Sequence, residues 1–146
     1  MTLFAVRFDY KLTSVDTAGA LAAMEITIPP KTLVKPHSHS REDEFTLVLS
    51  GVVGARVGDD VVHAEAGASM VKPRGVPHAM WNAGDEPARV LEILSPGGLE
   101  DYFEELDPIL TEHAPRAEYD ALADRYGLTI VDSWIEELEA AYGVKL

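Results

Sequence analysis

The sequence lacks cysteine altogether and has few basic residues relative to its acidic ones. Its 146 residues include no cysteine, five histidines, and 12 Lys or Arg against 25 Asp or Glu. Without cysteine, no disulfide can support the fold and no thiolate can serve as a nucleophile or a metal ligand. The formal net charge of −13 disfavours contact with nucleic-acid phosphates or anionic lipid. We therefore expect neither a nucleic-acid nor a membrane partner.

Long hydrophobic runs are missing as well. The longest apolar runs span a few residues, well short of the roughly 20 that a membrane-spanning helix needs. Near the N-terminus, Arg7 and Asp9 interrupt the apolar stretch that a signal peptide requires. The 47% of hydrophobic residues are nevertheless enough for one buried core. These features predict a cytoplasmic protein.

Residues 1–98 consist of short β-rich runs broken by turns. Examples are AAMEITI, EFTLVLS and ARVLEILS, and residues 57–61 and 82–86 each have the composition of a hairpin turn. No helical period separates these runs. This spacing predicts an all-β sandwich or barrel.

The periodicity becomes helical after SPGG, Ser95–Gly98. Apolar residues at helical spacing predict three helices, with landmarks at Leu99–Leu110, Tyr119–Gly127 and Ser133–Gly143, and Glu136 would complete a capping box with Ser133. Residues 100–146 contain 13 acidic and three basic residues, a pattern typical of a solvated helical surface rather than of a docking surface. We expect residues 99–146 to form an amphipathic tail that packs on the barrel of residues 1–98 as one structural domain.

The stretch PHSHSREDEFTLVLSG, residues 36–51, has a pattern typical of a metal site. Side chains alternate along a strand, so His37 and His39 point to the same side. Glu44 follows a polar run suited to a turn and would begin the next strand. In GASMVKPRGVPHAMWN, residues 67–82, a turn rich in proline and glycine precedes His78, which would arrive from a separate strand. Such nitrogen and oxygen ligands suit a divalent transition metal rather than magnesium or calcium. His63 and His113 have no motif partner and are interpreted as ordinary surface or interface residues.

These two stretches resemble the paired motifs of the cupins. The first motif matches at His37, His39, Glu44 and Gly51, and the second matches at Gly67, Pro73, Gly75, His78 and Asn82. One position departs, because Lys31 stands where the family has the first glycine. The resemblance implies a double-stranded β-helix, a jelly-roll barrel that holds one divalent metal on His37, His39, Glu44 and His78. The family's metal is iron, manganese, nickel, copper, cobalt or zinc.

Period-two counting also suggests a pocket wall. Counting from Glu44 sends Thr46 and Val48 inward, and counting from His78 sends Met80 and Asn82 inward. These four residues are the candidates for the substrate pocket. Met80 also fits the core, and Asn82 also fits a role in fixing the turn that follows it.

A second resemblance concerns the tail. SPGGLEDYFEELDPIL and RYGLTIV, within residues 95–131, match the outline of the quercetin dioxygenase-like cupins, although Leu99 replaces their usual aromatic residue. That group implies a dioxygenase acting on a small chelating enol or phenol, such as a flavonol, with Glu44 as general base. Two alternatives keep the metal: an oxygen-independent isomerase, lyase or polyketide-type cyclase, and a binding protein without turnover.

The N-terminal segment suggests self-association. Its residues LFAVRFDY alternate like a strand that needs a neighbour, and an unpaired edge strand is a liability unless it is covered. We therefore expect a homodimer in which N-terminal strands extend the partner's sheet.

Overall fold

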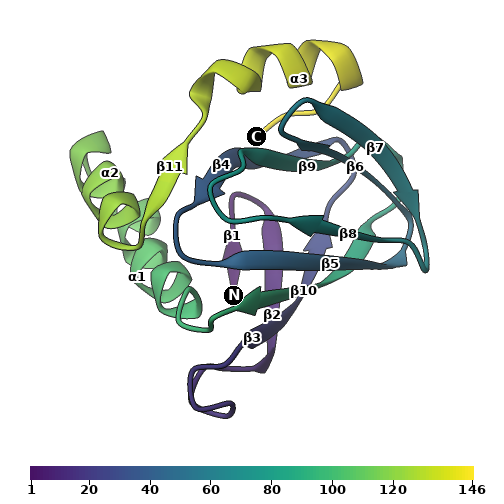
Figure 1. Cartoon of the computed structure of the whole chain (residues 1–146). Coiled ribbons are helices and arrows are strands. Elements are labelled where there is room, and N and C mark those ends of the chain that lie inside the picture. Colours follow the sequence, from purple (N-terminus) through teal and green to yellow (C-terminus); the bar gives the residue numbers. More distant parts are fainter.

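A computed structural model describes all residues, 1–146, and contains two facing antiparallel sheets (Figure 1). The first sheet has the order β1 (Thr2–Leu3), β2 (Val6–Leu12), β3 (Ala22–Ile28), β10 (Ala88–Ser95), β5 (Asp43–Ser50), β8 (Ser69–Lys72). The second has the order β11 (Leu128–Ile130), β4 (Thr32–His39), β9 (His78–Asn82), β6 (Val52–Val57), β7 (Asp60–Glu65). The prediction of an all-β barrel is confirmed.

The core lies between the two sheets, because apolar residues alternate inward along the strands. In β10, for example, Val90 and Leu94 are buried while Arg89 is exposed. In the second sheet, the ring of the fully buried Trp81 lies against Gly54 on the neighbouring strand. A Cβ at position 54 would lie 2.1 Å from Trp81 Nε1, so only glycine fits there.

The helical tail is confirmed, with two changes. It contains α1 (Glu100–Thr111), α2 (Arg116–Arg125), the short 3-10 helix η1 (Asp132–Trp134) and α3 (Ile135–Tyr142). The predicted capping box is wrong, because α3 begins at Ile135 after Trp134 and no side chain caps it. The tail also contains strand β11, which the helical periodicity did not predict.

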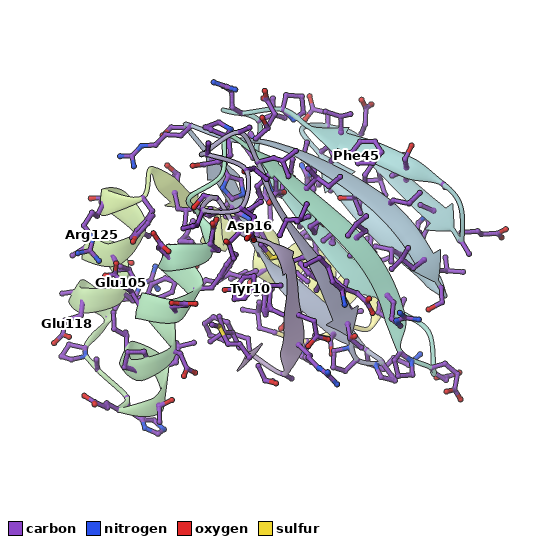
Figure 2. The ribbon with its side chains drawn as sticks, turned by 90° about the horizontal axis from the view of Figure 1, so that it is seen from below. Tyr10, Asp16, Phe45, Glu105, Glu118 and Arg125 are labelled. Atoms are coloured by element: carbon purple, nitrogen blue, oxygen red, sulfur yellow. The ribbon has the colours of Figure 1, made fainter.

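The helices cover two parts of the barrel. α1 and α2 lie together at one end of it, and α3 lies across the second sheet (Figure 1). Tyr10 on β2 lies beside α1 and donates a hydrogen bond to the carbonyl of Glu100 at 3.2 Å (Figure 2). On the other side, Leu138 of α3 packs with Leu33 and Trp81. None of the helices has the length and apolar character needed to cross a membrane.

The strand pairing bears on two expectations, the hairpin turn at residues 82–86 and the homodimer. Residues 82–86 do not form a hairpin turn, because β9 and β10 belong to different sheets and this segment crosses between them. The N-terminal strand β2 pairs with β3 of the same chain, with Phe8 opposite Ile26. On its other edge the two-residue β1 pairs only with Val6 and Arg7, so the rest of that edge has no strand partner within the chain, and the homodimer stays a prediction.

Candidate metal centre

The four predicted ligands meet inside the barrel. One donor atom from each of His37, His39, Glu44 and His78 lies within 4.8 Å of the others. His37 on β4 is paired directly with His78 on β9, in the second sheet. Glu44 enters from β5 in the opposite sheet, because residues 40–42 carry the chain across the barrel. The cluster can therefore surround an ion from both sheets.

Backbone carbonyls orient two of the imidazoles. Nδ1 of His37 lies 2.6 Å from the carbonyl oxygen of Lys35, and Nδ1 of His78 lies 3.1 Å from that of Val76. In each pair Nδ1–H is the donor, so Nε2 carries the free lone pair and faces the cluster. Such outer hydrogen bonds are typical of metal-ligating histidines.

The donor set fits a divalent transition metal. Glu44 Oε1 lies 3.2 Å from His39 Nε2, and Glu44 Oε2 lies 3.1 Å from His78 Nε2. Yet His78 Nε2 is buried without a satisfactory hydrogen bond. Burial lowers the pKa of His37 and of His78, which favours the neutral, ligating imidazole. Three neutral nitrogens and one carboxylate are ligands that transition metals accept.

The sequence reasoning missed a buried lysine beside the centre. Lys72, at the end of β8, lies directly opposite Glu44 on β5 and is 2% exposed. Its ammonium lies 2.7 Å from Glu44 Oε2 and 2.9 Å from Glu92 Oε1. Thr46 donates to the same Glu92 carboxylate at 2.9 Å. A charged network therefore continues from the candidate ligand Glu44 into the core.

This network separates the pKa values of its two carboxyl groups. Burial alone would raise the pKa of Glu44, but the charge of Lys72 and the close polar contacts with His39 and His78 outweigh it, and the pKa lies well below its usual range. Burial raises the pKa of Glu92 to about 7, against the opposing effect of Lys72. Glu44 is therefore the group that stays ionised near neutral pH.

Glu42 is a second residue that the sequence reasoning missed. It is 6% exposed, and its Oε2 lies 3.7 Å from Nδ1 of His39. Burial raises the pKa of Glu42. In the sequence, Glu42 belongs to the polar run SRED, and nothing in that run predicts that its side chain is buried.

A cavity of about 80 Å³ reaches the candidate metal centre from the barrel end that α1 and α2 cover. His37 and His39 form part of its wall. The remainder is largely apolar and comes from β4, the N-terminal segment and the tail, including Phe4, Phe8, Tyr102, Phe103, Tyr119 and Ile130. These wall residues were not predicted, because the sequence does not reveal how the tail packs.

The four predicted pocket residues lie elsewhere in the barrel interior and do not line this cavity. Val48 and Met80 belong to the main hydrophobic core, and the hydroxyl of Thr46 is engaged with Glu92. Asn82 fixes the following turn: its amide donates to the carbonyls of Ile28 and Glu86 and accepts from Gly84 N–H. Their role in substrate binding stays a prediction.

Neither remaining histidine is part of the cluster. The exposed His63 stands edge-on to Trp81, with ring centroids 6.1 Å apart, under α3. His113 is exposed just after α1.

This separation makes His63 a control for metal binding. We expect His37→Ala or His78→Ala to abolish stoichiometric binding of a divalent transition metal, because each removes one of four ligands. His63→Ala should leave the metal content unchanged. Elemental analysis of the three purified, metal-reconstituted variants measures this, and equal occupancy in all of them would contradict the assignment.

Comparison with known proteins agrees with this geometry. Residues 24–94, which include all four clustered residues, match the Cupin_2 family model, described as a cupin domain. The matched segment is just under half of the chain, and the fold is the double-stranded β-helix of the cupins. A predicted oxalate decarboxylase from Thermotoga maritima has a similar fold, with a TM-score of 0.60 and 21% identity over 62% of this chain and 80% of that one. At that identity the likeness concerns the cupin fold alone.

Two curated relatives match over part of their length. The tetracenomycin polyketide synthase protein TcmJ of Streptomyces glaucescens is 31% identical over 80 residues, 55% of this chain and 52% of TcmJ. Germin-like protein 9-3 of Oryza sativa subsp. japonica is 34% identical over 68 residues, 43% of this chain and 32% of the relative. The chain therefore spans from about a third to about half of the length of these relatives.

Proposed function

We propose that this cupin is a metal-dependent, dioxygenase-like enzyme acting on a small chelating enol or phenol, of the flavonol type. The observation that carries the proposal is the apolar cavity, whose wall includes His37 and His39 of the four-residue cluster. Part of a largely apolar substrate would occupy this space of about 80 Å³, and its enol or phenol oxygen would reach the centre.

Each residue of the cluster has a role in this proposal. His37, His39 and His78 hold the metal, and Glu44 is the fourth ligand. A transition metal, when bound, supplies a Lewis acid at which the substrate oxygen and dioxygen can be brought together. Glu44 accepts the hydroxyl proton at one carboxylate oxygen. The aromatic wall of the cavity excludes water from the reacting groups.

Oxygen uptake tests the proposal directly. We expect protein loaded with iron, manganese, nickel, copper or cobalt to consume dioxygen when quercetin or catechol is added, in proportion to product formed. The metal-free protein and His78→Ala are the controls, and both should remain at background. Absence of uptake with all five metals would contradict the dioxygenase proposal.

The similarity to TcmJ supports a second candidate, an oxygen-independent polyketide-type cyclase or isomerase. That reaction would use the same metal and the same base, with the metal acting on a carbonyl group. Product formed in an anaerobic chamber at the aerobic rate would favour this candidate. Saturable binding without any product would instead favour a binding protein.

A further inference from the structure

The cavity wall contains a single permanent charge. Apart from the two histidines, its residues are apolar or aromatic, except for Lys35 on β4. A lone ammonium beside apolar groups is unfavourable unless an anion or an aromatic face accompanies it. The partners of Lys35 therefore indicate what the cavity is built to receive.

Lys35 is held in place without being neutralised. Its Nζ lies 4.6 Å from the centroid of the Tyr119 ring and 5.9 Å from that of Phe4. The nearest carboxylate, Asp132, is 4.0 Å away at Oδ1 and pairs more closely with Arg116, at 2.8 Å. The side chain of Lys35 is 18% exposed. With one long ion pair to a carboxylate that Arg116 shares, the ammonium of Lys35 keeps N–H donors for an anion at the cavity wall.

The position of Lys35 is fixed relative to the candidate metal centre. Lys35 and His37 both line the cavity, two residues apart on β4, and the carbonyl of Lys35 accepts the Nδ1–H of His37. Two residues of a regular strand span about 7 Å between Cα atoms, and the pairing of β4 with β9 is irregular between Val34 and His37. A molecule of that length can contact both the ammonium and the cluster.

We propose that the substrate is a small, largely apolar enol or phenol that also has a carboxylate, and that this carboxylate binds Lys35 while the enol or phenol oxygen reaches the metal centre. This inference rests on the proposed function and narrows its substrate class. Arg74, which lies near the centre in sequence, is not an alternative anchor, because its guanidinium already pairs with Asp43 at 2.9 Å.

Caffeate and its neutral primary amide test the inference. Both have a catechol for the metal centre, and they differ in the charge at the other end. We expect metal-loaded wild-type protein to bind caffeate about 10 to 100 times more tightly, as a charge-assisted hydrogen bond predicts. Lys35→Met should abolish this preference while the amide binds as before. Calorimetric titration measures all of these affinities.

Matched variants separate local pairing from net charge. Lys11→Met removes an exposed cation from β2 and should keep the full preference for caffeate. Lys35→Arg should keep most of it, and Lys35→Gln repeats the neutral substitution with a polar side chain. Equal binding of the two probes to the wild type, or a preference that survives both neutral substitutions, would overturn the anion site alone. Binding of neither probe to metal-loaded wild type would overturn the proposed function and the anion site together.

Discussion

Lys72→Met is expected to lower the free energy of unfolding of the metal-free protein by about 3–5 kcal/mol, the usual cost of removing one partner from a buried ion pair. The ammonium lies within 2.9 Å of two buried carboxylates, of Glu44 and Glu92. Without it, two acids would remain in the core with no compensating charge. Methionine keeps most of the length and apolar volume of lysine, so the loss reports on charge rather than on a cavity.

Two further variants make this expectation specific. Lys11→Met removes an exposed lysine that pairs with Glu25 at 3.4 Å, and it should change stability by less than about 0.5 kcal/mol. Adding Glu92→Gln to Lys72→Met should restore part of the loss, because one of the stranded carboxylates becomes neutral. Urea unfolding at constant pH measures all three proteins. A loss for Lys72→Met no larger than that for Lys11→Met would show that the network does not stabilise the fold.

The convergence of the four clustered residues was predictable because the signals that specify it are short-range. Alternation along one strand sends His37 and His39 to the same side, and a polar turn leads directly to Glu44. A turn rich in proline and glycine likewise lies directly before His78 and indicates that a new strand begins there. The periodicity of the tail gave α1 and α2 for the same reason, since each helix buries a face that repeats every three or four residues.

The surroundings of the centre were not predictable, because they depend on contacts between distant segments. Lys72 faces inward only because β8 pairs with β5 in one particular register, which places Lys72 opposite Glu44. Glu92 comes from a strand almost 50 residues beyond Glu44 in the chain. The cavity wall requires β11 to pair beside β4, with Ile130 opposite His37. No local pattern in the sequence specifies these pairings.

The four residues predicted for the pocket wall show the same limit. Counting in twos correctly sends Thr46, Val48, Met80 and Asn82 into the barrel, where all four are buried. Parity gives the face of a sheet but not the depth along the barrel. The cavity lies at the end where α1 and α2 pack, beside His37 and His39, whereas these four residues lie among the core side chains. Distinguishing inward-facing residues that line the cavity from those in the core requires knowing where the tail packs.

Glu44→Gln is expected to lower turnover by about 10²–10⁴-fold at full metal occupancy, on any substrate that the wild type converts. A glutamine can still lie between His39 and Lys72, but its amide is not basic near neutral pH and cannot accept the substrate proton. If Glu44 were a ligand alone, the substitution would weaken metal binding and excess metal would restore the activity. Saturating metal should therefore restore activity if Glu44 is only a ligand, and should fail to restore it if Glu44 is also the base.

Glu42→Gln is the matched control for this measurement. It neutralises another buried carboxyl group, one that lies 3.7 Å from His39 but outside the four-residue cluster. Because Glu42 lies 3.7 Å behind a ligand, beyond hydrogen-bond distance, its loss should weaken metal affinity by at most about 10- to 100-fold and be corrected by saturating metal. Turnover of both variants should be measured with metal content determined on the same samples. Near wild-type turnover of metal-saturated Glu44→Gln would reduce Glu44 to a ligand and favour the binding-protein alternative. A deficit confined to Glu44→Gln at full metal occupancy would instead identify this carboxylate as the base, since Glu42→Gln shows what the loss of another buried carboxylate beside His39 costs.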